Sequence, residues 1–182
     1  KLRRKEINGN IGIAHTRWAT HGEPTSLNAH PHVSKNTVSV VHNGIIENYI
    51  ELKNKQLKQG YEFESETDTE VIAHAIDSEL QSNIPLIESV QKAVNALKGS
   101  YGLGIISSNF PDRIIATRKG SPLLIGIGEK GNYIASDQIA LLSETKKFIF
   151  LEDGDIAEIK IDKVTIIDID GNLVKRPIVI SK

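Results

Sequence analysis

Two apolar runs decide the fold: Phe148-Ile149-Phe150-Leu151 and Leu123-Leu124-Ile125. Each has the length of a β-strand, and neither carries a polar residue that would face water on one side of a sheet. A strand that is apolar on both faces is covered on both faces by other layers. The two runs therefore predict strands buried between layers, and an α+β fold with stacked sheets rather than an open barrel.

The residues around these runs predict further strands, paired mainly antiparallel. Short β-type segments follow one another at 103–107, 113–117, 123–127, 133–135, 147–150, 155–161, 164–169 and 173–176. Turn residues such as Asp170-Gly171-Asn172 separate them, and tight turns between consecutive strands indicate antiparallel pairing. Two earlier strands are expected at 11–15 and 38–42, with a turn-rich loop over 20–36 between them.

Helical spacing of apolar residues predicts three helices in the middle of the chain, over 45–57, 71–80 and 86–97. Ser65 or Thr67 is a candidate N-cap for the second helix, and Pro85 suits the first turn of the third. No linker-like composition interrupts the sequence. Residues 1–182 are therefore expected to form one domain.

Composition excludes several classes of protein. Lys and Arg total 22 against 23 Asp and Glu, so the chain lacks the basic excess that nucleic-acid binding needs. No apolar run approaches the ~20 residues of a membrane helix, and a cytoplasmic protein with no membrane partner is expected. The absence of Cys excludes disulfides and thiolate metal sites within these residues. Because the chain begins at Lys1 and contains no Met, we expect a fragment.

Two motifs that could bind a cofactor or a metal have simpler interpretations. Gly126-Ile127-Gly128-Glu129-Lys130-Gly131 matches the dinucleotide-binding glycine pattern, but a strand rather than a helix is predicted to follow it, which favours a hairpin turn. His15, His21, His30, His32 and His42 cluster in the sequence without the carboxylates that usually accompany metal ligands. We expect structural histidines, no metal and no cofactor, while a metal-dependent hydrolase stays open as an alternative.

The segment His15-Thr16-Arg17-Trp18-Ala19-Thr20-His21-Gly22 is typical of a loop that recognises an anion. The planar guanidinium of Arg17 suits a carboxylate, and hydroxyl and imidazole donors follow it at once. The alternative is a surface arginine stacked on Trp18.

Two further segments complete a plausible site. Asn43-Gly44 can direct a side-chain amide and a backbone N–H at one oxygen, as an oxyanion hole requires, although Asn-Gly is also a common turn. Ser65-Glu66-Thr67-Asp68-Thr69-Glu70 places carboxylates at a helix start, where they either cap the helix or hold a substrate ammonium. Together the three segments describe a site for an amino acid that undergoes acyl chemistry. A nucleophile is missing.

These segments resemble the glutaminase domain of the glutamine:fructose-6-phosphate aminotransferases. The resemblance covers nearly the whole chain and extends to Asn28-Ala29-His30-Pro31-His32, Ile45-Ile46-Glu47-Asn48, Gly99-Ser100-Tyr101-Gly102, Gly120-Ser121-Pro122 and Ala135-Ser136-Asp137. It implies the αββα sandwich of the N-terminal nucleophile hydrolases. It also implies that L-glutamine is hydrolysed to glutamate and ammonia, and that ammonia passes to a separate isomerase domain that converts fructose 6-phosphate to glucosamine 6-phosphate.

The resemblance also implies roles for individual residues. Arg17, Thr20 and His21 would bind the glutamine α-carboxylate, and Asp68 would bind the α-ammonium group. Asn43 and Gly44 would form the oxyanion hole. Trp18 would lie at the mouth of the ammonia route, on a loop that closes over the substrate. The complete enzyme would be a homo-oligomer.

The chain departs from this family at the nucleophile, which is an N-terminal Cys whose own amine acts as the base. No Cys occurs in these residues, so we expect a domain truncated at its N-terminus that does not hydrolyse glutamine alone. Two alternatives stay open: a catalytically dead glutamine-binding module, and the glutaminase domain of another amidotransferase of the same type.

Overall fold

The structure, a computed structural model, describes residues 9–16 and 22–181, and within them strands form two antiparallel sheets. The large sheet has the order β1 (His32–Ser34), β2 (Val38–Ile46), β3 (Gly99–Ser107), β4 (Phe110–Lys119), β8 (Ile156–Ile159), β9 (Val164–Ile167) and β10 (Leu173–Val174). The small sheet has the order β11 (Val179–Ile180), β7 (Lys147–Phe150), β5 (Leu124–Ile127) and β6 (Asn132–Ala135).

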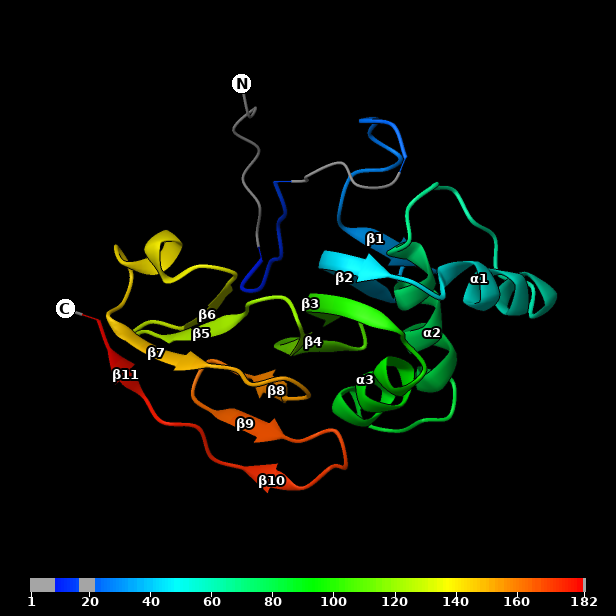
Figure 1. Cartoon of the computed structure of the whole chain (residues 1–182). Coiled ribbons are helices and arrows are strands. Elements are labelled where there is room, and N and C mark those ends of the chain that lie inside the picture. Colours follow the sequence, from blue (N-terminus) through cyan, green and yellow to red (C-terminus); the bar gives the residue numbers. More distant parts are fainter. Residues whose placement is uncertain (1–8, 17–21, 182) are drawn as a thin grey trace.

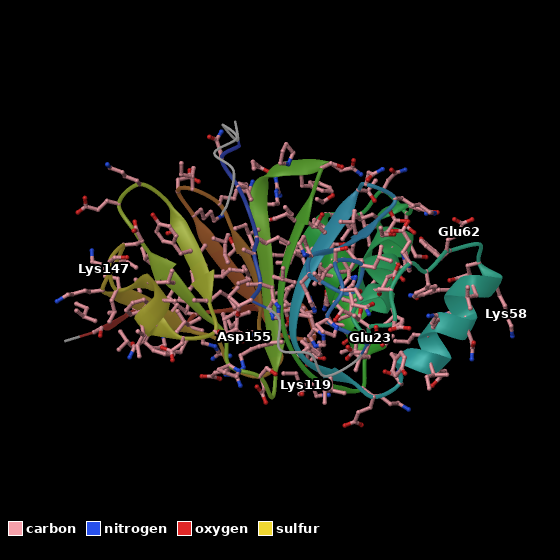
Figure 2. All side chains as sticks on the ribbon, turned by 90° about the horizontal axis from the view of Figure 1, so that it is seen from above. Glu23, Lys58, Glu62, Lys119, Lys147 and Asp155 are labelled. Atoms are coloured by element: carbon pink, nitrogen blue, oxygen red, sulfur yellow. The ribbon has the colours of Figure 1, made fainter. Side chains whose placement is uncertain are left out.

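Three α-helices cover one face of the large sheet, and the small sheet lies against its other face (Figure 1). The helices are α1 (Tyr49–Lys58), α2 (Glu70–Leu80) and α3 (Leu86–Asn95). Seen from above, the layers run from the small sheet near Lys147 to α1, which ends at Lys58 (Figure 2). The expected α+β fold with stacked, mainly antiparallel sheets is therefore confirmed.

Apolar side chains from both sides of the large sheet hold the layers together. On the helix side, Ile72 and Val90 pack against Val40 and Ile105 with no solvent exposure. Between the sheets, the core cluster contains Leu123, Ile125, Ile149, Leu151, Ala116, Ala157, Ile159 and Ile166. The two apolar runs thus lie between layers, as their composition predicts.

The outer face of the small sheet is covered, within the described residues, by a short 3-10 helix, η1 (Gln138–Leu141). Leu141 of this helix packs on Leu124 and Phe148, which point away from the large sheet. The order of layers is therefore helices, large sheet, small sheet and η1. Each layer buries the apolar face of the next one.

The first predicted helix was placed too early in the sequence. Ile45 and Ile46 belong to β2, where they pair with Ser100 and Gly99 of β3, and α1 begins only at Tyr49. The apolar spacing gave the wrong phase because Ile50 is exposed on α1, whereas Ile46 is fully buried in the sheet. Pairing along β3 therefore extends the strand beyond the point where the helical pattern seemed to start.

Three other sequence predictions are corrected. Residues 11–15 form no strand: Ile13 lies over the face of β3, where its Cγ2 atom would be 3.8 Å from a Cβ atom at Gly104, and does not pair with a strand edge. The loop predicted over 20–36 contains β1. Neither Ser65 nor Thr67 caps α2, whose N-cap is Thr69. The glycine pattern at 126–131 is the β5–β6 hairpin, as expected.

Candidate active site

A cleft of about 550 Å³ opens between β2 and β3 of the large sheet and β6 of the small sheet. His15, Asn43, Ile134 and Ser136 line it, and its floor includes Gly104. A Cβ atom at Gly104 would lie 2.8 Å from the Cδ1 atom of Ile134, so the two sheets approach each other closely at the bottom of the cleft. The cleft is therefore bounded by rigid strands on two sides.

Asn43 lies inside β2, not at its end as predicted, and its side chain is exposed to the cleft. Val40 and Ile46 of the same strand face the helices, and alternation along the strand turns Asn43 to the opposite side. The Oδ1 atom of Asn43 lies 2.6 Å from Nε2 of His15. Because an amide oxygen can only accept, His15 donates this hydrogen bond and orients the Asn43 amide.

Gly44 occupies a position that no other residue fits. Its φ of +135° lies in a region that side chains rarely adopt, and a Cβ atom would lie 2.1 Å from the carbonyl oxygen of Ser100. Gly44 pairs with Tyr101 of β3 in the sheet register. The glycine therefore serves the close approach of β3 to β2, and the Asn-Gly pair forms no turn.

Asp68 lies in the segment that leads into α2, and its side chain is 3% exposed. Its Oδ2 atom accepts a hydrogen bond from the backbone nitrogen of Ile46, 2.7 Å away. Ile46 ends the strand on which Asn43 lies three residues earlier. The structure thus brings two predicted site residues, Asn43 and Asp68, to the same strand from distant parts of the sequence.

Glu70 fixes the shape of the segment that carries Asp68. Its carboxylate accepts hydrogen bonds from the backbone nitrogens of Glu64 and Ser65 and from the Ser65 hydroxyl. Burial alone would raise the pKa of Glu70, but bonding from His74, Ser65 and the two backbone groups outweighs burial and lowers the pKa to about 2. Glu70 therefore remains ionised, and the segment around Asp68 is closed by a charged hydrogen-bond acceptor.

Two buried histidines hold the threonines that flank Asp68. His32 Nε2 lies 3.0 Å from the Thr67 hydroxyl, and His42 Nδ1 lies 2.9 Å from the Thr69 hydroxyl. Burial lowers the pKa of His42, an effect that the charge of Asp68 partly opposes. These histidines act as structural groups in the described contacts, as the sequence analysis favoured.

Asn28 joins the loop after residue 21 to the Asp68 segment. Its side-chain oxygen accepts from the backbone nitrogen of Glu66, and its side-chain nitrogen donates to the Glu66 carboxylate and to the Glu23 carbonyl. Figure 2 labels Glu23 on this loop, beside the large sheet. Sequence reasoning did not single out Asn28 as a structural clamp, although Asn28 lies in one of the segments that carry the resemblance.

Four predicted site residues, Arg17, Trp18, Thr20 and His21, lie outside the described residues. The first described residue after them is Gly22, where an added Cβ atom would lie 3.1 Å from the Cβ atom of Glu66. Glu66 is two residues from Asp68. The segment that follows the predicted carboxylate-binding loop therefore lies against the segment that carries the predicted ammonium-binding residue.

The described histidines do not form a metal site with neighbouring carboxylates. Across residues 9–16 and 22–181, no group of three or more His, Asp or Glu side chains could hold a metal ion. His15 and His30 instead pack ring against ring, with centroids 4.4 Å apart, and His30 and His32 do so at 4.9 Å.

Within residues 9–16 and 22–181, none of the helices combines the length and apolar character that a membrane span requires.

The chain is similar in sequence to a family of known proteins. A sequence profile described as "Glutamine amidotransferase domain" matches residues 15–143, which include Asn43, Gly44 and Asp68. The chain belongs to the glutamine amidotransferase domain family.

Curated relatives agree with this assignment. Over 96% of its length, the chain is 55% identical to a glutamine–fructose-6-phosphate aminotransferase (isomerizing) from Haemophilus influenzae. Over 92% of its length, the chain is 56% identical to the enzyme of the same name from Pseudomonas putida. The chain spans only 28% of the length of either relative.

A solved structure supports the fold. The glutamine phosphoribosylpyrophosphate amidotransferase from B. subtilis, complexed with ADP and GMP, superposes with a TM-score of 0.70 at 25% identity. The match covers 87% of this chain and 35% of that one. The fold is thus that of the N-terminal nucleophile amidotransferases, as the resemblance implied.

Proposed function

We propose that residues 1–182 act as one glutaminase domain, which binds L-glutamine in the cleft between the sheets and stabilises the tetrahedral intermediate formed at its side-chain amide. The observation that carries this proposal is the attachment of Asp68 to the strand that bears Asn43. The carboxylate that pairs with the substrate ammonium, on the segment before α2, is thereby fixed relative to the strand that carries the amide donating to the oxyanion. A substrate with both groups would be held at two points.

The chemical roles follow from the residue types. When a nucleophile adds to the glutamine amide, negative charge develops on the carbonyl oxygen. The NH2 group of Asn43 and the backbone N–H of Gly44 would donate to that oxygen, and one such donor typically contributes about 10²–10³-fold to the rate. Arg17, Thr20 and His21 would hold the α-carboxylate, and Trp18 would cover the substrate and the exit of ammonia.

For the whole protein we propose conversion of fructose 6-phosphate to glucosamine 6-phosphate with glutamine as the nitrogen donor, in the cytoplasm and in a homo-oligomer. The names of the two curated relatives support this reaction, and the identities of 55% and 56% support the same substrate at the glutaminase site. The 182 residues contain no Cys. Alone, they would therefore bind glutamine without hydrolysing it measurably, since nucleophilic catalysis needs an attacking group.

Two measurements test the proposal. Isothermal titration of the 182-residue chain is expected to detect saturable binding of L-glutamine, with much weaker binding of D-glutamine as the stereochemical control. The full-length gene product is expected to release ammonia from L-glutamine and to form glucosamine 6-phosphate when fructose 6-phosphate is added. Glutamine binding without turnover by the full-length product would instead identify a dead binding module. Steady turnover by the 182 residues would refute the expected inactivity.

A further inference from the structure

We propose that Thr69 is a positioning residue for glutamine hydrolysis. Its hydroxyl bonds to His42 and sets the placement of Asp68 relative to Asn43. The inference rests on the proposed function, because it concerns how a bound glutamine is positioned with its ammonium group at Asp68 and its side-chain amide at Asn43 at the same time. It assigns a task to a pair of buried side chains that the proposed chemistry does not itself use.

The pair connects the direct sequence neighbours of the two substrate residues. His42 precedes Asn43 on β2, and Thr69 follows Asp68 at the N-cap of α2. The His42 and Thr69 side chains are 4% and 1% exposed, and Nδ1 lies 2.9 Å from the hydroxyl oxygen. A single buried hydrogen bond thus links the strand of the oxyanion hole to the segment of the ammonium site.

The direction of this hydrogen bond is fixed by the other nitrogen of His42. Nε2 lies 3.4 Å from the carbonyl oxygen of Ser100, which can only accept, so Nε2 carries the hydrogen. Nδ1 of the neutral ring is then an acceptor, and the Thr69 hydroxyl donates to it. Valine in place of Thr69 removes this donor and leaves a buried imidazole nitrogen without its partner, while serine keeps the donor.

Two hydrogen bonds attach the Asp68 segment to β2, one from Asp68 itself and one from Thr69. Because Asp68 keeps its own bond, loss of the Thr69 bond affects the position of Asp68 relative to Asn43 more than it affects the affinity for glutamine. The carboxylate bonds to the backbone of Ile46, at the end of β2, whereas Thr69 bonds near Asn43, further back along the strand. With both bonds present, the segment is attached to β2 at two points, besides the bonds that tie Glu66 to Asn28 and Thr67 to His32. Without the bond to His42, Asp68 still binds an ammonium group, but its position along β2 shifts and the amide of the substrate is displaced from Asn43.

The decisive experiment compares Thr69→Val with Thr69→Ser in the full-length gene product, measuring glutaminase kcat and KM for L-glutamine. We expect valine to lower kcat at least about tenfold, since a displacement near 1 Å costs about 10²-fold, while KM changes less than about threefold. Serine is expected to retain kcat within about twofold of the wild type, because the hydroxyl donor is kept. If the valine variant fails to fold, Thr69→Ala is measured with the same expectation.

The matched control is Ser89→Ala, which removes the hydrogen bond of another buried hydroxyl. Ser89 lies on α3 and its hydroxyl donates to the carbonyl oxygen of Pro85, 3.2 Å away, in a part of the core that does not line the cleft. It should leave kcat unchanged. An equal loss of kcat in this control, or an unchanged kcat in Thr69→Val, would overturn the inference while the proposed function stands. A wild-type protein that releases no ammonia would overturn both.

Discussion

The carboxylate of Asp68 lies 2.7 Å from the backbone nitrogen of Ile46, and this hydrogen bond joins the entrance of α2 to the end of β2. As a consequence, the same strand, β2, carries Asn43 in the cleft and anchors the Asp68 segment at its last residue. Glu70 closes that segment from behind, and Asn28 ties it to the loop that begins at Gly22. A binding site for a small zwitterion is thereby built around one strand.

Asp68→Asn is expected to weaken L-glutamine binding to the chain by about 10–100-fold. This range corresponds to the loss of a charged hydrogen bond of about 1.5–3 kcal/mol. Isothermal titration measures the loss. Glu64→Gln makes the same change of charge on an exposed side chain of the same segment and should leave the affinity within about twofold. Equal affinities of the wild type and Asp68→Asn would remove Asp68 from the site.

Glu70 makes stability depend on pH in the acid range. Its pKa is lowered to about 2 in the folded protein, below the ordinary value of 4.5, so its stabilising contribution is present above pH 4.5 and is lost as the pH falls toward 2. Glu70→Gln should therefore cost about 1.5–3 kcal/mol at pH 7 and little at pH 2.5. Urea unfolding at both pH values measures the difference. A cost that does not change with pH would show that the charge of Glu70 is unimportant.

The sequence alone predicts those parts of the fold that depend on local pattern. The apolar runs at 123–125 and 148–151 predict buried strands, and α2 and α3 follow from helical spacing of apolar residues. The predicted start of α1 is wrong because β2 ends where its pairing with β3 ends, at the pair formed by Ile46 and Gly99, which are 53 residues apart in the sequence. Non-local pairing cannot be read from a local period.

The sequence predicts residues of the candidate site from their chemical types, but not the hydrogen bonds that hold those residues in place. Asn43 and Asp68 are predicted from the chemistry that their side chains can perform; the structure places Asn43 on β2 and bonds Asp68 to the last residue of that strand. The contacts of Asn28, Glu70 and Thr69 were not predicted, because a buried polar group shows its partner only after the chain has folded. What these three residues share is a polar side chain that is buried in the folded chain.

Thr117→Val is expected to stabilise the protein. Thr117 of β4 is fully buried, and its hydroxyl oxygen has no hydrogen-bond partner among the described residues. Valine has nearly the same shape and removes a polar group that was desolvated without compensation, which should raise the free energy of unfolding by about 1–2 kcal/mol. Urea unfolding at pH 7 measures the change. A destabilised variant would mean that the hydroxyl has a bound water as its partner.

Gly44→Ala should be among the most destabilising single changes in the chain. The φ of +135° is strained for any side chain, and the added Cβ atom would lie 2.1 Å from the Ser100 carbonyl oxygen, which is backbone and cannot turn away. Separating β2 from β3 is the way to relieve the contact, so we expect the free energy of unfolding, measured in urea, to fall by at least about 3 kcal/mol.

Gly60→Ala is the matched control: Gly60 also has a positive φ, +86°, but no atom lies within 4 Å of its added Cβ. This control should lose only about 1 kcal/mol, the conformational cost of replacing glycine after a helix. Similar losses in the two variants would show that conformation rather than the contact with Ser100 requires glycine at position 44.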